Sequence, residues 1–312
     1  MSDVVAQRLS SDHYAPATIP SEVREFAGSP DTLPVGHPGK VGLLELGFER
    51  VGARTELVRR FQKSPLQIMR PLYVDPSRPD LPVVYLMSTG GGVVQADRLR
   101  LDVDCGADTA VHLTTQAATK VHHMDADFAT QTVGLCVGPQ AYLEYLPDAL
   151  IPYPGARFYQ RTTVTVDPTA TVLVGEVLMA GRLARREQHQ YDVLATDLEI
   201  ADADGGAVAI DRIRFSPHRF SVTGPGVLGE HTLMATLFVV SPLRPAAAIA
   251  DALHGAIADQ VTAGVSVLPD ERGAWVRILG TDSPTVQMTL RRAWDTARRL
   301  LIGVPAPLLR KT

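Results

Sequence analysis

Residues 90–123 read GGGVVQADRLRLDVDCGADTAVHLTTQAATKVHH, and this stretch predicts two short strands joined by a tight turn. After the glycines, apolar side chains alternate with charged ones at Leu99, Leu101 and Val103. A period of two is typical of a strand with one buried face. Gly106, Ala107 and Asp108 then predict a turn into a second strand. Polar side chains gather at the strand ends, where loops often carry function.

The same strand–turn–strand unit recurs twice further along the chain. The turns at Gly106, Gly138 and Asp167 lie 32 and then 29 residues apart, and each is flanked by apolar alternation. A unit repeating at this interval predicts coils stacked on one another, as in a β-solenoid or a helical β-sandwich. A simple meander of antiparallel strands is the alternative.

Three regions differ in character. Residues 1–40 are rich in proline, serine, aspartate and glycine and predict a loosely ordered N-terminal arm. Residues 41–240 are a succession of short apolar runs and predict the β-rich core. Residues 241–312 predict a helix–hairpin–helix portion packed on that core. The expected fold is therefore mainly β, an elongated solenoid-like or stacked β-sandwich core with a small C-terminal two-helix subdomain.

The two expected helices have separate signals. The first has an apolar stripe at every fourth residue, formed by Ile249, Leu253, Ile257 and Val261. A hairpin over residues 265–280 follows it. The second helix is predicted to have Ser283 as its N-cap and Pro284 in its first turn.

One face of the second predicted helix is basic. It carries Arg291, Arg292, Arg298 and Arg299. We expect this face to be solvated, and the alternative is a docking surface for an acidic partner.

Composition excludes several classes of protein. The chain has 312 residues and a formal net charge of −4, so its surface is not the basic one that nucleic acid requires. No secretory signal and no apolar run of membrane-spanning length is present, so no membrane partner is expected. Two cysteines, Cys105 and Cys136, cannot make a disulfide framework. A cytoplasmic location is therefore predicted.

The sequence lacks the motifs of common enzymes. It has no phosphate-binding Gly-x-x-x-x-Gly-Lys-Ser/Thr loop, no Gly-x-Ser-x-Gly elbow and no His-Glu-x-x-His helix. We therefore expect that the chain is not an enzyme. A β-solenoid hydrolase using Glu144 and Asp148 as an acid–base pair stays open as an alternative.

Several motifs between residues 40 and 240 occur in the order found in one protein family. They are the Gly90–His123 stretch, Leu143–Asp148, Ile151–Tyr153, Gly155–Arg157, Gly175-Glu176 and Gly181-Arg182. On these motifs the chain resembles the urease accessory protein UreD (UreH) family. Where that family usually has Gly-Gly before the aspartate, this chain has Gln95-Ala96, and His122 stands where a tyrosine is common.

The resemblance implies a function and partners. It implies a urease maturation factor in an accessory complex that inserts nickel into apo-urease with GTP hydrolysis. Our hypothesis is that this chain is the scaffold and nickel conduit of that complex. The implied partners are a UreF-like helical protein, a UreG-like GTPase and apo-urease. The alternative is a purely structural adaptor that never touches nickel. The resemblance also implies a β-helix-like fold.

A conduit would need weak ligands that face the interior of a β-rich body. Candidates are the carboxylates, hydroxyls and amides of Asp97, Glu144, Asp148 and Glu176, with Thr115 and Gln116. Single oxygen ligands attract a divalent cation without holding it, so Ni(II) is expected to bind transiently and no cofactor tightly. His122 and His123 are weaker candidates, because adjacent residues of a strand point to opposite faces.

Two of these carboxylates have a simpler structural explanation. Glu176 interrupts an apolar run, so it is either on a solvated face or buried and paired, for example with Arg182. Asp97 is also suited to a turn in which its side chain bonds its own backbone.

Overall fold

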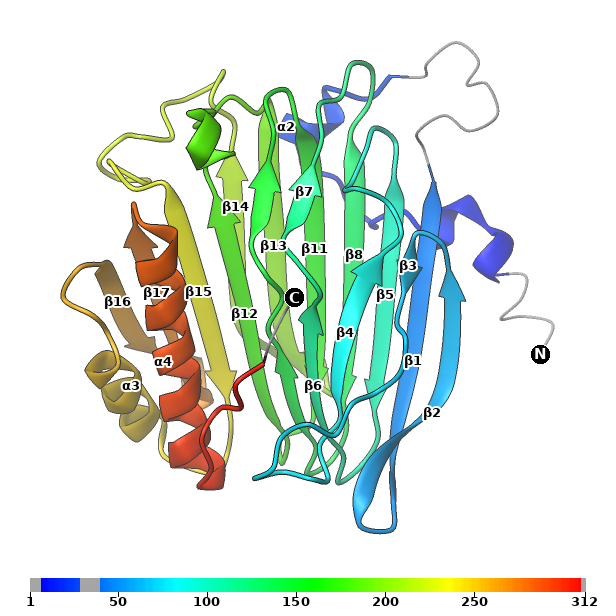
Figure 1. The fold of residues 1–312 in the computed structure, drawn as a ribbon, viewed down its shortest axis with the longest axis vertical. Coiled ribbons are helices and arrows are strands. Elements are labelled where there is room, and N and C mark those ends of the chain that lie inside the picture. Colours follow the sequence, from blue (N-terminus) through cyan, green and yellow to red (C-terminus); the bar gives the residue numbers. More distant parts are fainter. Residues whose placement is uncertain (1–6, 29–39, 310–312) are drawn as a thin grey trace.

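A computed structural model of the chain, which describes residues 7–28 and 40–309, contains two facing β-sheets with helices covering one of them (Figure 1). The seven-stranded sheet has the order β14 (Ala207–Phe215), β13 (Val193–Asp202), β11 (Arg157–Val166), β8 (Ala129–Val137), β5 (Arg98–Cys105), β1 (Val41–Val51) and β2 (Arg54–Lys63). The ten-stranded sheet has the order β16 (Thr262–Val267), β17 (Gly273–Gly280), β15 (Leu233–Val240), β12 (Thr171–Met179), β9 (Tyr142–Tyr145), β6 (Ala110–Thr115), β4 (Val83–Ser88) and β3 (Leu66–Gln67), with β10 (Leu150–Pro152) and β7 (Thr119–Val121) beside it.

The helices are few and short, apart from one. The described helices are η1 (Ser11–His13), α2 (Ser21–Arg24), η2 (Leu183–Arg185), α3 (Ala246–Gly255), η3 (Pro269–Glu271) and α4 (Ser283–Ile302). Within residues 7–28 and 40–309, no helix has the length and apolar character needed to cross a membrane.

The repeated units are stacked, as the sequence predicts. β5, β8 and β11 pair in parallel in the seven-stranded sheet, while β6, β9 and β12 pair in parallel in the ten-stranded sheet. Each predicted turn therefore carries the chain from one sheet to the other. The mainly β, solenoid-like prediction is confirmed. The antiparallel strands β2 and β14 close the two edges of the seven-stranded sheet.

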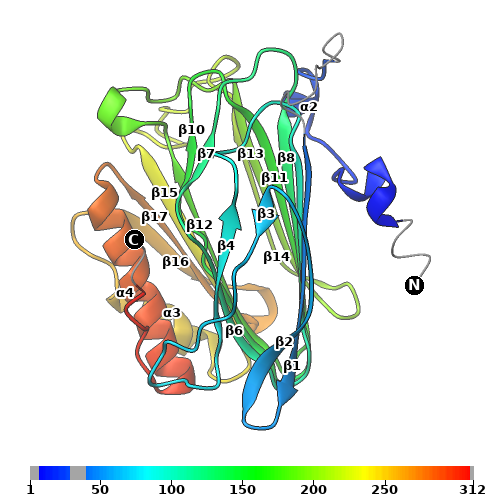
Figure 2. The same cartoon turned by 45° about the vertical axis from the view of Figure 1, so that its right-hand side comes forward.

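Apolar side chains fill two layers. One layer lies between the sheets, where alternate residues of facing strands, such as Leu101, Val133 and Val172, form the core. The other lies between the ten-stranded sheet and helices α3 and α4, which cover its outer face (Figure 2). Leu173, Ile249 and Trp294 belong to this second cluster. The central strands of the ten-stranded sheet are therefore buried on both faces, so the side chains that point to either face are shielded from solvent.

The C-terminal portion differs from the prediction in two details. The hairpin forms as β16 and β17, and Ile249 and Leu253 are buried on α3. However, α3 ends at Gly255, so the rest of the predicted stripe, Ile257 and Val261, follows the helix. The N-cap of α4 is Asp282 rather than Ser283, because its carboxylate accepts the Thr285 main-chain N–H at 2.9 Å.

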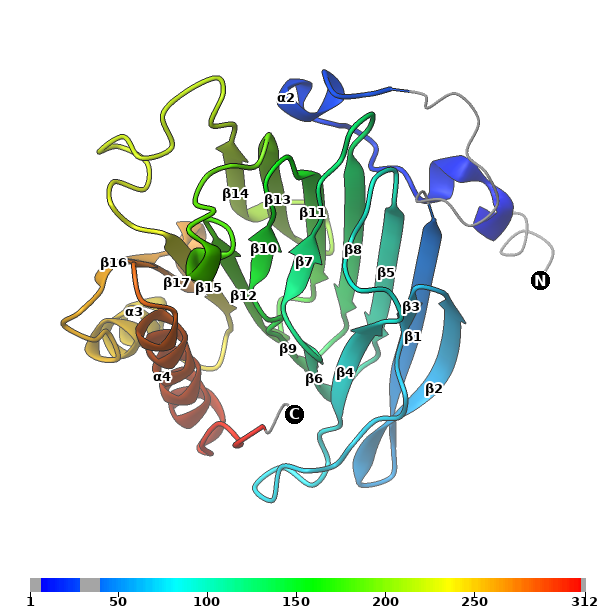
Figure 3. The ribbon, with the colours of Figure 1, turned by 45° about the horizontal axis from the view of Figure 1, so that its top comes forward.

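The described part of the predicted N-terminal arm lies on the outer face of the seven-stranded sheet (Figure 3). Val23 of α2 packs among Phe128, Tyr159 and Val193, and Tyr14 after η1 is also buried. Residues 1–6 and 29–39, which belong to the same prediction, lie outside the described residues.

Candidate functional site

A polar layer crosses the space between the two sheets, and Glu176 stands at its centre. Along β12, Val172, Val174 and Glu176 share the face that looks toward the seven-stranded sheet. One carboxylate oxygen of Glu176 accepts the Gln160 amide at 3.2 Å, and the other accepts the Thr196 hydroxyl at 3.1 Å. Glu176 is therefore held by side chains of the opposite sheet, and Arg182 instead pairs with Glu187.

The polar layer continues past Glu176 to the edge of the sandwich. In register, Glu176 on β12 lies beside Thr236 on β15, which lies beside Arg277 on β17. The guanidinium of Arg277 donates to the Thr236 hydroxyl at 3.3 Å and forms an ion pair with Asp211 of β14. The side chains of that pair are 28% and 18% exposed, so the layer reaches solvent there.

The environment of Glu176 favours its neutral form. Burial, and then the charge of Asp211, raise its pKa from the ordinary 4.5 to about 7, against the lowering effect of Thr196 and Arg277. The carboxyl group is thus close to half-ionised at neutral pH. A cation that entered the layer would favour the charged form.

This raised pKa predicts how stability changes with pH. Between pH 4.5 and 7 the folded state binds more protons at Glu176 than the unfolded state, so the free energy of unfolding falls as pH rises through this window. Glu176→Gln removes this contribution. At pH 8 we expect the variant to be more stable than the parent by about 2–3 kcal/mol, and at pH 4.5 the difference should vanish. Urea unfolding at both pH values measures this, and a gap that does not change with pH would contradict it.

A larger cavity adjoins this layer at the glycine-rich loop. It has a volume of about 240 Å³ and is lined by Gly90–Val93, by Thr115 and Gln116, and by Gln131 of β8. Tyr145 is a common wall of this cavity and of a small one, about 20 Å³, beside Glu176. Gln131 is also the register neighbour of Gln160, which links the two cavities along the seven-stranded sheet.

Glu144 lies on the opposite face of the ten-stranded sheet, against α4. Its oxygens accept His112 Nδ1–H at 2.7 Å, the Tyr142 hydroxyl at 2.6 Å and Trp294 Nε1–H at 2.9 Å. Burial would raise the pKa of Glu144, but His112 and the charge of Arg298 hold it below the usual range. The side chain is a fully buried, fully bonded anion in the structural layer under the helix.

Arg298 completes this buried network and corrects one expectation. It donates to Asp75 at 2.6 Å and to Glu144 at 3.4 Å, and its side chain is 0% exposed. The prediction that it belongs to a solvated basic face is wrong. Two buried carboxylates, one from a loop and one from β9, require a cation at this position of α4.

The other carboxylate on this side is Asp148, which lies in the loop after β9. Its main-chain N–H donates to the Thr115 hydroxyl at 2.8 Å. Asp148 also lines a cavity beside α4, together with Met288 and Trp294 of that helix. Asp148 therefore belongs to the helix-covered side, and Thr115 connects it to the inter-sheet side through the backbone.

Asp97 holds a turn before β5. Its carboxylate accepts the main-chain N–H groups of Lys40 and Val94, each at 3.0 Å, and it is 2% exposed. Ala96 beside it has φ +61°, a left-handed backbone in which glycine is usual. The side-chain amide oxygen of Gln95 accepts the main-chain N–H groups of Asp125 and Ala126 at 2.8 and 2.9 Å. The bonds from Lys40 and Val94 match the structural explanation of Asp97 as a turn residue.

The two histidines point to different partners. His122 Nε2 lies 3.3 Å from the Gly91 carbonyl, and His123 Nε2 lies 2.8 Å from Asp125. That hydrogen bond raises the pKa of His123. The rings therefore do not share a ligand position.

Of the candidates from the sequence, three face the space between the sheets: Thr115, Gln116 and Glu176. Sequence reasoning missed Gln131, Gln160, Asp211 and Arg277, which complete the polar layer. Alternation along β14 could have identified one of them. Asp211 lies two residues from both Ala209 and Ile213, so it shares the buried face of the strand with these apolar residues. Carboxylate, amide and hydroxyl oxygens of this layer could contact a divalent cation singly, which permits rapid exchange.

Comparisons with known proteins agree on one family. Residues 40–312 match the family model described as UreD urease accessory protein. The chain is 56% identical to urease accessory protein UreD 2 of Streptomyces griseus, over 92% of this chain and 99% of the relative. It is 35% identical to urease accessory protein UreD 2 of Brucella suis, over 92% and 96%. It is 38% identical to urease accessory protein UreD of Haloarcula marismortui, over 89% and 92%.

Proposed function

Because the chain belongs to the UreD family of urease accessory proteins and so has a role in urease maturation, we propose that it is the scaffold and nickel conduit of an accessory complex. In this proposal a UreF-like helical protein and a UreG-like GTPase bind the chain, and the complex docks on apo-urease in the cytoplasm. GTP is hydrolysed by the GTPase partner. The chain itself catalyses no reaction and passes the ion.

The polar layer is the observation that supports a conduit. A sandwich of this size can fill its interior with apolar side chains, yet here oxygen-bearing side chains cross it from the glycine-rich loop to Asp211 and Arg277. Burying polar groups costs free energy unless they are bonded, so such a layer is expected where it serves a function. The cavity of about 240 Å³ provides an entrance with room for a hydrated ion.

The chemistry of the layer suits passage rather than storage. Glu176 and Asp211 are the two carboxylates, and Gln160 and Thr196 are neutral oxygen donors. Nickel(II) accepts carboxylate, amide and water oxygens, and one ligand at a time does not retain it. The neighbouring Arg277 offsets part of the negative charge, which would further shorten the residence of the ion.

One observation favours the purely structural adaptor. The cavity beside Glu176 is about 20 Å³, which is room for about one water molecule. A hydrated cation would pass only if Glu176 or Tyr145 moved. An adaptor needs no such motion and would bind its partners through the surface of the sandwich.

Activation of purified apo-urease tests the proposed role in maturation. The assay supplies nickel, bicarbonate, GTP and the two accessory partners, with or without this chain. We expect urease activity to develop at least about tenfold faster with the chain, because the partners alone lack the connection to urease. Equal activation without the chain would contradict the proposal.

A further inference from the structure

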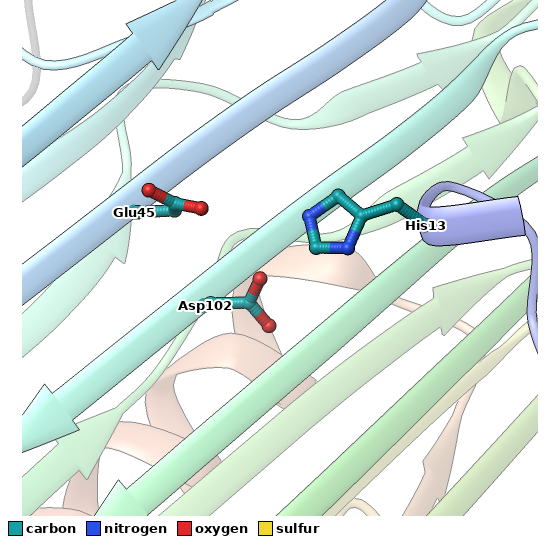
Figure 4. Close-up of side chains that lie close together, drawn as sticks. All are labelled: His13, Glu45 and Asp102. Carbon is teal, nitrogen blue, oxygen red and sulfur yellow. The ribbon is translucent and has the colours of Figure 1, made fainter. Parts of the chain in front are cut away.

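His13, Glu45 and Asp102 meet on the outer face of the seven-stranded sheet, away from the polar layer (Figure 4). They come from three elements, η1, β1 and β5, which are far apart in the sequence. One ligand atom from each lies within 4.8 Å of the other two. Within the described ranges of the chain, this is the one group of three histidine, cysteine or carboxylate side chains close enough to hold a metal ion together.

The two carboxylates are placed side by side by the strand register. Glu45 of β1 is the direct partner of Asp102 of β5, and like charges directly opposite each other are unfavourable. Arg8 pairs with Glu45, and Arg100 pairs with Asp102 at 2.6 Å, so each carboxylate has a cation on one side. Arg8 contacts both oxygens of Glu45, so a bound ion would share these oxygens with the guanidinium. Arg100 contacts only Oδ2 of Asp102 and leaves Oδ1 outside the pair.

The imidazole of His13 has an unmet bonding requirement. Its Nε2 is enclosed but has no hydrogen-bond partner among the described residues. The backbone of His13 is fixed in place because Arg100 donates to its carbonyl at 2.8 Å. A neutral imidazole nitrogen offers a lone pair to a metal ion, and Nε2 is the ring atom left without a partner.

We propose that His13, Glu45 and Asp102 form a binding site for a divalent first-row transition ion, which fastens the N-terminal segment to the sheet. An ion with bonds of about 2.1 Å holds neighbouring ligand atoms about 3 Å apart and opposite ones about 4.2 Å apart. Small side-chain rotations bring three atoms that lie within 4.8 Å into that range. The imidazole selects Zn²⁺, Ni²⁺ or Co²⁺ over Mg²⁺ and Ca²⁺.

The site is independent of the proposed conduit. It joins η1 to β1 and β5 on the outer surface (Figure 4). The polar layer lies between the sheets. Arg8 and Arg100 offset the two negative charges, so moderate affinity with water at the open coordination positions is expected. Its role is to stabilise the docked segment.

Calorimetric titration of the full chain with Zn²⁺ alone tests this site, and no urease is needed. The parent chain should bind one more equivalent of Zn²⁺ than His13→Gln, or bind that equivalent at least about tenfold more tightly, which is 1.4 kcal/mol. Glu45→Gln should lose the same equivalent. The matched control is His218→Gln, which removes an exposed imidazole that pairs with Asp192. Equal binding by the parent and His13→Gln, or the same loss in the control, would overturn the proposal.

Limited proteolysis gives a second readout. Trypsin cleavage at the exposed Arg24 requires the docked segment to detach. A ligand at ten times its dissociation constant lowers the population of the detached state about tenfold. Zn²⁺ should therefore protect Arg24 in the parent chain and in His218→Gln, but not in His13→Gln. Protection that persists in His13→Gln would also contradict the site.

Discussion

Replacing Arg298 by methionine is expected to lower the free energy of unfolding by about 3–5 kcal/mol. The guanidinium is the buried cation between Asp75 and Glu144, and both carboxylates are 2% exposed or less. Methionine fills similar space but leaves Asp75 without its ionic partner and leaves Glu144 with only the hydrogen bonds from His112, Tyr142 and Trp294. Urea unfolding followed by circular dichroism at pH 7.5 measures the loss.

Arg299→Met is the matched control for this variant. Arg299 is the next residue of α4 and pairs with Asp295 at 2.7 Å, but its side chain is 60% exposed. An exposed pair contributes little, so we expect a loss below about 0.5 kcal/mol. If the two variants lost equal stability, the buried network would not be what fixes α4 to the sheet.

Glu176→Leu is expected to slow the activation of apo-urease by about tenfold or more. A carboxylate about 4 Å from a divalent ion attracts it by several kcal/mol at an effective dielectric constant near 20, and Arg277 and water offset part of this. If about 1.4 kcal/mol of this attraction is left beside Glu176 in the proposed passage, its loss corresponds to a tenfold slower rate. The initial rate of activation, at equal concentrations of folded protein, measures it.

Glu199→Leu controls for the loss of a surface charge. Glu199 lies on the outer face of β13 and pairs with Arg161 at 3.5 Å, so we expect activation at the parental rate. Glu176→Gln keeps the volume of the side chain and removes its charge. If Glu176→Gln activates as slowly as Glu176→Leu, the loss of charge explains the effect. If Glu176→Gln activates at the parental rate, the changed shape and polarity of the leucine side chain explain it. If Glu176→Leu binds its partners and activates normally, the adaptor explanation holds and the conduit fails.

Local patterns were sufficient to predict the stacked β architecture. Leu99, Leu101 and Val103 alternate with charged residues because one face of β5 is buried and the other is only partly covered, and the structure has this alternation. The three turns could be recognised because a stacked coil places equivalent residues at a constant interval. β5, β8 and β11 then pair in parallel without a shift of register.

Patterns could not assign the carboxylates to one layer. Alternation identifies two faces of a strand, but both faces of the ten-stranded sheet are buried, one against the facing sheet and one against the helices. Glu144 and Glu176 both interrupt apolar runs, yet they point in opposite directions. The positions of Asp75 and Arg298 depend on contacts across more than 200 residues of sequence, and no local period encodes them.

The position of Arg298 has a consequence for biosynthesis. The chain leaves the ribosome N-terminus first, so Asp75 and Glu144 emerge long before α4 does. Until residue 298 is released, the carboxylates of Asp75 and Glu144 lack the Arg298 guanidinium that pairs with them. The face of the ten-stranded sheet that α4 covers stays exposed to solvent. Burial of that side therefore awaits the synthesis of α4. A product truncated before Ser283 would expose an apolar patch with two acidic side chains, which chaperones and proteases could recognise.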